Sequence, residues 1–226
     1  SVGQRERITQ KRVIQLFTKH LGYHYLGYWH KREDSRNIEP GLVSAWLTKR
    51  GVSEGLIACA LRQLDRASSL GEGRILYDAN KEVYRLLRYG VKDKEGAGEQ
   101  NQTVWLVDWK NTEANDFAIA EEVTYNGENK KRPDLVLYVN GNALGVIELK
   151  RSTVSVSEGI RQNLDNQQKA FIRNFFTTIQ LVMAGNDLEG LRYGVIETPE
   201  KYYLLWKEPA ESPYTNMLAL HLAQVC

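Results

Sequence analysis

The stretch RPDLVLYVNGNALGVIELK, residues 132–150, decides the fold. Two runs of apolar residues, rich in branched side chains, flank an Asn-Gly pair, which is typical of a β-hairpin. Apolar side chains occupy both sets of alternating positions in these runs, so both faces of each strand are apolar, as in strands at the centre of a sheet. We therefore predict two central antiparallel strands over residues 133–139 and 143–150.

The length of the turn decides which side chains of this hairpin share a face, because strand side chains alternate between the two faces. A two-residue turn at positions 140–141 would pair Asp134 with Ile147. A three-residue turn at positions 140–142 would pair Asp134 with Glu148 and bring their Cβ atoms to about 4.5–5.5 Å. We expect the three-residue turn.

Lys150 follows Glu148 by two residues and would lie on the same face. Two carboxylates and an amine at one end of a doubly apolar sheet are expensive to desolvate, and a divalent cation between the carboxylates would relieve their repulsion. The alternative is a surface hairpin in which Asp134, Glu148 and Lys150 form a plain salt bridge. An exposed hairpin would have one polar face throughout, whereas these charges cluster at one strand end, which favours a functional site.

The residues after the hairpin predict one helix over 157–176. Ser155 and Glu158 form a capping-box pattern. One helix face carries Ile160, Leu164, Phe171 and Phe175. Gln167 lies about 20° from Ile160 on the helical wheel, so its side chain points inward. It would face either the strand end with the charged residues or the core, bonded to backbone.

Other segments also have a clear period. Apolar residues at helical spacing predict helices that begin near Thr9 and that cover residues 40–47, 53–70 and 78–90. Residues 91–102 are polar and contain glycine, so we expect an exposed loop there. Alternating or β-branched runs predict strands over 103–109, 117–125, 179–184 and 202–206.

The composition is that of a globular protein, with 226 residues, 42% hydrophobic and 26% charged. No apolar run is long enough for a membrane helix or a signal peptide, so we expect a cytoplasmic protein without a membrane partner. Two cysteines and four scattered histidines indicate neither a disulfide framework nor a zinc site. Residues 130–173 hold eight basic and four acidic side chains, which suggests a surface for a polyanion or simply a solvated, mixed-charge surface.

Pro133-Asp134 followed by Glu148-x-Lys150 looks like the PD-(D/E)xK nuclease signature. The wider stretches LVDWKNTEANDFAIAEEV, RPDLVLYVNGNALGVIELK, IRQNLDNQ and LRYGVIETPEKYYLLWKE resemble the N-terminal region of the restriction subunit (HsdR) of type I restriction-modification enzymes, from about residue 8 to residue 208. The resemblance implies an α/β, restriction-endonuclease-like fold, with a central mixed sheet flanked by helices after a helical N-terminal segment. It also implies Mg²⁺-dependent endonuclease cutting of DNA.

The resemblance assigns roles to the charged residues of the hairpin. Asp134 and Glu148 would ligate Mg²⁺, or Mn²⁺ as a substitute, with the backbone carbonyl of Leu149 as a further ligand. Lys150 would orient the attacking water or stabilise the transition state. The metal would lower the pKa of the water and neutralise charge on the phosphate.

Relatives carry a glutamine after this strand, and Gln167 is the best match, with Gln162 and Gln168 as rivals. The tyrosine that many relatives have four residues later is absent here. Related nucleases often add a carboxylate from an earlier helix, for which Glu82 is the candidate; the alternative is an exposed ion pair with Arg85. Phosphate contacts that do not read sequence are expected from Lys130, Lys131, Arg132, Arg151 and Arg161.

We expect a single nuclease domain over 1–226, in a fragment of a longer chain. Residues 1–75 would be a mainly helical lead-in, 76–208 the PD-(D/E)xK core, and 209–226 the start of a linker toward a motor region. The sequence has no GxxxxGK[ST] phosphate loop, so ATP would be used by the full-length protein and not bound by this part. The resemblance implies DNA, a methyltransferase subunit and a specificity subunit as partners.

Two other functions remain open from the sequence. The first is a noncatalytic DNA-binding or docking module, which the intact Asp134, Glu148 and Lys150 disfavour. The second is a free-standing repair or junction nuclease, which the wider resemblance disfavours.

Overall fold

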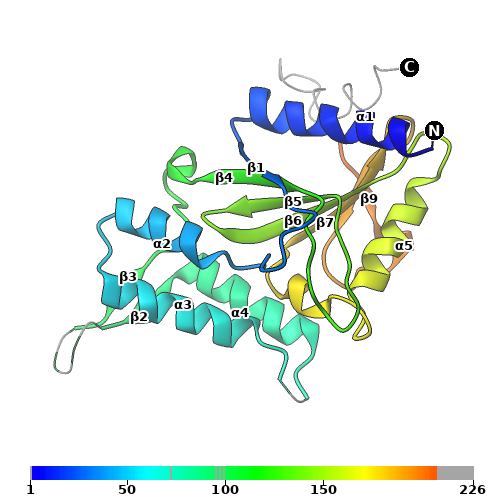
Figure 1. Ribbon diagram of the computed structural model, residues 1–226. Helices are drawn as coiled ribbons and strands as arrows, with labels where there is room; N and C mark the ends of the chain where they lie inside the picture. Colours follow the sequence, from blue (N-terminus) through cyan, green and yellow to red (C-terminus); the bar gives the residue numbers. More distant parts are fainter. Residues whose placement is uncertain (1, 72, 95, 97, 99, 208–226) are drawn as a thin grey trace.

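A mixed seven-stranded sheet with helices against both faces forms the centre of the protein (Figure 1). The structure is a computed structural model that describes residues 2–207 except 72, 95, 97 and 99. The first element of the chain is a helix, and the strands of the sheet run both parallel and antiparallel. The α/β fold class expected from the sequence is therefore confirmed; residues 209–226, the expected linker, lie outside the described residues.

The helices are α1 (Val2–Gln15), continued by a π-helical turn (Leu16–His20), α2 (Pro40–Lys49), α3 (Glu54–Ser68), α4 (Leu76–Tyr89) and α5 (Val156–Asn166). Short 3₁₀ turns cover Thr112–Ala114, Arg173–Thr177 and Glu200–Tyr202. The strands are β1 (His24–Tyr28), β2 (Val91–Asp93), β3 (Gln102–Val104), β4 (Phe117–Glu121), β5 (Leu135–Val139), β6 (Asn142–Leu149), β7 (Leu181–Asn186), β8 (Gly190–Gly194) and β9 (Leu204–Leu205).

The order of strands in the main sheet is β1-β4-β5-β6-β7-β8-β9. The β1–β4 and β6–β7 pairs are parallel, and the other neighbouring pairs are antiparallel. The crossover between parallel β6 and β7 contains α5, which is the connection that parallel strands require. Strands β5 and β6 lie in the middle of the sheet, as their doubly apolar sequence predicts.

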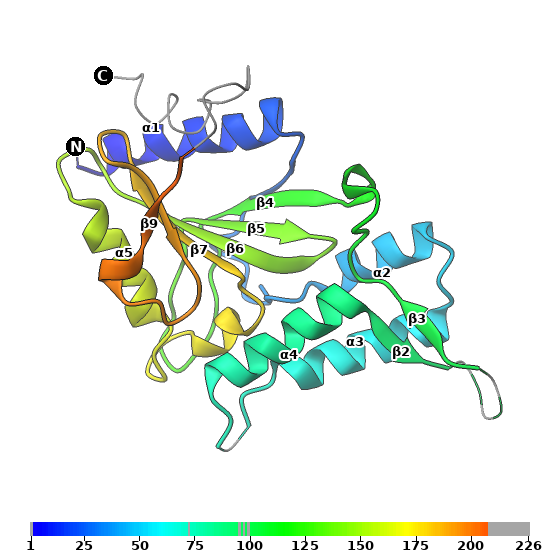
Figure 2. The ribbon, with the colours of Figure 1, turned by 180° about the vertical axis from the view of Figure 1, so that it is seen from behind.

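Different helical segments pack on the two faces of the main sheet (Figures 1 and 2). Val13 of α1 and Phe17 pack on the face that carries Ile119 and Ile147. Helix α5 and the 3₁₀ turn at 173–177 pack on the opposite face. Helices α2, α3 and α4 form a separate apolar cluster with the small β2–β3 sheet, beside the main sheet.

The sequence misplaced several elements. Residues 103–109 do not form one long strand, because Leu106 and Val107 turn into the helical cluster and only Gln102–Val104 pair, with β2. Consequently the ends of the expected loop 91–102 are strands. Strands β1 and β8 were not expected from the sequence, and the strand expected over 202–206 is reduced to β9 after a 3₁₀ turn.

The register of the β5–β6 hairpin matches the expectation, but the turn does not. Val139 pairs with Asn142, so the turn has two residues, and the predicted three-residue turn is wrong. A bulge at Leu144 then shifts the register, and Leu135 pairs with Ile147. Asp134, one residue before, consequently faces Glu148.

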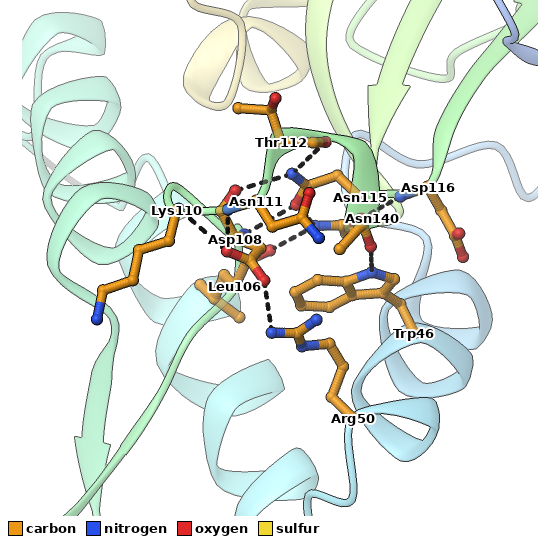
Figure 3. A network of polar contacts seen from close by, with 11 residues as sticks. Trp46, Arg50, Leu106, Asp108, Lys110, Asn111, Thr112, Asn115, Asp116 and Asn140 are labelled. Atoms are coloured by element: carbon orange, nitrogen blue, oxygen red, sulfur yellow. Dashed lines mark hydrogen bonds and ion pairs between the residues drawn. The ribbon is translucent and has the colours of Figure 1, made fainter.

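The turn itself is fixed by a polar network (Figure 3). Asn140 has a positive φ of 49°, and its side chain donates to the Leu106 carbonyl (2.9 Å) and to Asn115 Oδ1 (2.8 Å). Its Oδ1 accepts from the Asp116 backbone N–H at 2.7 Å. The same segment is held to α2 by a hydrogen bond from the Trp46 indole to the Ala114 carbonyl at 3.0 Å.

Gly141 lies where α2 begins. Its φ of 83° favours glycine, and its carbonyl accepts from the Glu39 N–H at 2.8 Å. A Cβ at this position would lie 2.6 Å from the backbone nitrogen of Val43 and 2.8 Å from Cβ of Leu42. A larger residue would therefore push α2 away from the turn.

We expect Gly141→Ala to lower the free energy of unfolding by about 3 kcal/mol, because left-handed strain and steric overlap add up. Gly51→Ala is the matched control: its φ is 75°, but no atom lies within 4 Å of the added Cβ. The control should lose about 1 kcal/mol from strain alone. Urea unfolding measures both, and equal losses would contradict the role given to the packing of α2 on the turn.

Candidate functional site

Asp134, Glu148 and Lys150 meet at one end of the sheet, on the face that α5 covers. Asp134 precedes β5, and Glu148 and Lys150 lie at the end of β6. Glu148 pairs with Ala184 of β7, a member of the apolar cluster that includes α5. The convergence is the expected one, although a two-residue turn and a bulge at Leu144 produce it in place of the expected three-residue turn.

The carboxyl group of Glu148 is fully buried, with 0% of the residue exposed. Its Oε2 accepts a hydrogen bond from Nε2 of Gln162 at 2.9 Å, whereas Oε1 has no partner among the described residues. Buried polar atoms without a partner are rare and expensive. The oxygen is therefore available to a ligand.

Gln162 also connects this carboxyl group to the lysine. Its Oε1 accepts a hydrogen bond from Nζ of Lys150 at 2.5 Å. Since the amide donates at one end and accepts at the other, the two contacts fix its orientation. Asp134 is held separately, with Oδ2 accepting from the Leu149 backbone N–H at 2.7 Å.

Burial raises the pKa of both carboxyl groups. Desolvation raises the pKa of Asp134 to about 6, although the Leu149 N–H and the nearby Lys150 ammonium act in the opposite direction. Desolvation, followed by the charge of Asp134, raises the pKa of Glu148 well above its ordinary value. One proton between two opposed carboxyl groups reduces the same repulsion that a cation would reduce.

Gly159 lets α5 approach this site. A Cβ there would lie 3.0 Å from Cβ of Ala184, 3.5 Å from Cγ of Lys150 and 3.6 Å from Cβ of Glu148. The small residue keeps the helix close enough for Gln162, three residues later, to reach both charged side chains.

Gln167 does not lie beside these residues, and its assignment to the site is corrected. It is buried, as the wheel predicted, but it is the C-cap of α5, because the helix ends at Asn166 and not at 176. Its Nε2 donates to the Asn163 carbonyl at 3.0 Å, and its Oε1 accepts from the Glu197 N–H at 2.6 Å. The helical wheel gives the direction of the Gln167 side chain around the helix axis, but it does not give the position of the residue along that axis. Gln168, the other rival, is exposed and bonds Asp165.

Glu82 belongs to a different part of the molecule. Its two oxygens accept from Arg85 at 2.7 and 3.0 Å, and it lines a cavity together with residues of α3. The ion pair weighed as the alternative is the observed one, and the idea that Glu82 joins the metal site is wrong.

Glu122, which the sequence analysis missed, is close to the site. Its backbone N–H donates to the Asp134 carbonyl at 2.7 Å, and it has a positive φ of 52°. Its carboxylate forms an ion pair with Arg132 and accepts from Gln10 at 3.4 Å. Its charge contributes to the raised pKa of Asp134 and Glu148. Its position after β4 was the available signal, because β4 pairs with β5.

The five expected phosphate-contacting residues differ in their availability. Arg132 is paired with Glu122, and Arg161 with Glu158 and Glu200. Lys131 lies over the ring of Phe171 at 4.3 Å and lines a cavity of about 750 Å³ that Lys150 and Gln162 also line. Lys130 is exposed and Arg151 partly exposed.

The raised pKa of Asp134 predicts a pH dependence of stability. Asp134 has a higher pKa in the folded state than in the unfolded state, so it binds its proton more tightly in the folded protein and stabilises the fold at low pH. This contribution to the free energy of unfolding is lost as the pH rises from the ordinary pKa of 3.8 through the folded-state pKa of about 6. Without divalent cations, the free energy of unfolding of the wild type relative to Asp134→Asn should fall by about 2–3 kcal/mol between about pH 4 and pH 8. Urea titrations across this range measure it; a difference that stays constant or rises with pH would contradict the burial of this carboxyl group.

Two relatives from Methanocaldococcus jannaschii match parts of the chain. The type I restriction enzyme MjaIXP endonuclease subunit is 28% identical over 133 residues, 56% of this chain and 13% of that protein. The type I restriction enzyme MjaVIIIP endonuclease subunit is 39% identical over 74 residues, 31% of this chain and 7% of that protein. The matched part is thus a small fraction of either relative.

No helix in the described part of the chain is long and apolar enough to cross a membrane. Residues 3–201 match the family described as the type I restriction enzyme R protein N terminus. This match spans most of the chain and includes every residue of the site described above. The chain therefore belongs to the family of N-terminal regions of type I restriction enzyme R proteins.

Proposed function

We propose that this chain is the Mg²⁺-dependent endonuclease region of a type I restriction-modification enzyme and that it hydrolyses phosphodiester bonds of DNA. The observation that carries the proposal is the buried, unpartnered Oε1 of Glu148 opposite Asp134. A structural ion cluster would have its oxygens satisfied. The raised pKa values of the pair support the proposal, because strongly perturbed carboxyl groups cluster at functional sites.

The chemistry of this donor set fits a hard divalent cation. Asp134, Glu148 and the Leu149 carbonyl would supply oxygen ligands, and Mg²⁺ ordinarily keeps several waters in addition to one or two carboxylates. When bound, the ion lowers the pKa of a water and neutralises charge on the scissile phosphate. Among the residues that the structure describes, no three His, Cys, Asp or Glu side chains group as a metal site, so water and the Leu149 carbonyl would have to complete the coordination by the carboxylate pair.

Lys150 would contact the attacking water or the phosphate. Gln162 holds its ammonium group on the side of the sheet where Glu148 lies, and we assign Gln162 a positioning role through these two contacts. In this proposal Gln162 takes the place in the site that was expected for Gln167. The cavity beside Lys150 gives room for the DNA backbone, with Lys131 on its wall as a phosphate contact. Lys130 and Arg151 would add contacts that do not depend on sequence.

The use of ATP and the assembly with other subunits would depend on the full-length protein. We propose that ATP is used by the full-length subunit, that methyltransferase and specificity subunits of the same enzyme are its partners, and that the specificity subunit reads the DNA target. The enzyme would act in the cytoplasm. The family membership and the names of the relatives support this assignment.

Asp134→Ala and Glu148→Ala should each abolish DNA cutting by the assembled enzyme while ATP-driven translocation continues. The carboxylates hold the metal, and the motor would lie elsewhere in the subunit. Asp65→Ala is the matched control, since Asp65 is exposed and paired with Arg36. Cleavage at the wild-type rate by either site variant would remove that residue from the mechanism and favour a noncatalytic docking module.

Gln162→Ala and Gln167→Ala should affect different quantities. Gln162→Ala should lower the cleavage rate at saturating Mg²⁺ by roughly 10–100-fold, because Lys150 and Glu148 lose their shared partner. Gln167→Ala should lower the free energy of unfolding by about 1–2 kcal/mol, because the Glu197 N–H loses its acceptor, while the cleavage rate stays close to wild type. Cleavage assays and urea unfolding of both variants measure these two quantities. Slow cleavage by Gln167→Ala together with near-wild-type cleavage by Gln162→Ala would return Gln167 to the site.

A further inference from the structure

A second cavity, of about 640 Å³, lies between α3 and α4 and shares no lining residue with the cavity beside Lys150. Three guanidinium groups line it. Arg62 and Arg66 are one helical turn apart on α3, and Arg74 precedes α4. None of the three forms an ion pair with an acidic residue of the described chain at salt-bridge distance.

The two acidic residues of this cavity are already engaged. Glu82 binds Arg85 through both oxygens. Asp93 accepts from the Lys94 N–H and from Nε2 of Gln63, each at 2.9 Å. The nearby charges of Arg74 and Arg62 lower the pKa of Glu82 and Asp93 only in addition to these closer partners. Three arginines and two acidic residues line the cavity, and Glu82 is in addition paired with Arg85, so the lining carries an excess of positive charge.

Arg74 is held in place by backbone. Its Nη1 donates to the carbonyls of Arg66 (3.0 Å) and Ser69 (2.9 Å), which leaves its other N–H groups for a ligand. A guanidinium group that is oriented before binding loses less conformational entropy when it binds. Arg62 makes one described hydrogen bond, to Sγ of Cys59 at 2.8 Å, so most of its donors are also available.

We propose that this cavity binds a phosphate group, held by Arg62, Arg66 and Arg74. Guanidinium groups bind the oxygens of phosphate in paired hydrogen bonds, and three of them from two segments suit a tetrahedral group with several oxygens better than a planar carboxylate. The phosphate belongs either to a DNA backbone or to a free anion. This site does not depend on the proposed cleavage chemistry, because it shares no residue with it.

The test compares Arg62→Gln/Arg66→Gln with Lys81→Gln/Arg88→Gln, a control that removes two charges from the exposed side of α4 outside the cavity. Binding is measured in EDTA, so no cleavage occurs and the result is independent of the nuclease proposal. One arm uses a labelled duplex of about 20 base pairs, with anisotropy between about 50 and 200 mM KCl. The other arm uses inorganic phosphate and acetate, with calorimetry.

If a DNA phosphate is the ligand, the cavity variant should weaken duplex binding about tenfold, and the slope of log K against log salt should decrease by about 2, with little change in the control. If the ligand is a free anion, the variant should lose the heat of phosphate binding and bind the duplex as the control does. Equal behaviour of variant and control in both arms would overturn the proposal. Acetate binding as tight as phosphate binding would also overturn it, in favour of an acidic protein partner.

Thermal unfolding of both variants shows whether the fold persists. If the double variant is unfolded, Arg74→Lys is tested in its place. This substitution keeps the positive charge but removes the guanidinium group that donates to the Arg66 and Ser69 carbonyls. We expect Arg74→Lys to unfold at the same temperature as the wild type and to bind the same phosphate probe at least threefold more weakly. Unchanged binding would overturn the role given to Arg74.

Discussion

The Asn140–Gly141 turn is the constraint on which the site depends. The Asn140 side chain fixes it to residues 106–116, and the close packing of Gly141 on α2 leaves no room for a Cβ. From this fixed end, a single bulge at Leu144 sets the register of β5 on β6. A slip by one residue would turn Glu148 to the other face of the sheet, away from α5. The polar network at one end of the hairpin thus determines which carboxyl groups meet at the other.

The meeting of Asp134 and Glu148 opposes stability. Both carboxyl groups lie in a part of the sheet where burial raises their pKa, and the charge of Glu122 raises it further. The surroundings offset this only in part: Gln162 satisfies one oxygen of Glu148, the Leu149 N–H satisfies one of Asp134, and Arg132 engages Glu122. The proposed metal would satisfy the buried Glu148 oxygen that these contacts leave without a partner.

Charge is distributed differently in the two cavities. Beside the hairpin, acidic and basic side chains are mixed, and Arg132 and Arg161 are paired with acids. Lys131, Lys150 and Arg161 line the cavity, and of these Lys131 and Lys150 form no ion pair with a described acidic residue. Between α3 and α4, both acids have close partners, whereas Arg62, Arg66 and Arg74 form no ion pair at salt-bridge distance with a described acidic residue. Ion pairing therefore decides where an anion can bind, and a count of basic residues along the sequence does not reveal it.

Periodicity in the sequence determined the central position of β5 and β6 and most helices, and the resemblance to a known family implied the mixed α/β fold. The strands and helices follow from local patterns that repeat over many residues. The expected meeting of Asp134 and Glu148 rested on a three-residue turn, whereas a two-residue turn and a bulge at Leu144 produce it. Tertiary structure decided the rest. It ended α5 at Asn166 and so selected Gln162 over Gln167. It also bound Glu82 to Arg85 and brought Glu122 beside Asp134 through strand pairing. Such choices depend on distances between segments far apart in the chain, which a helical wheel or a strand pattern does not contain.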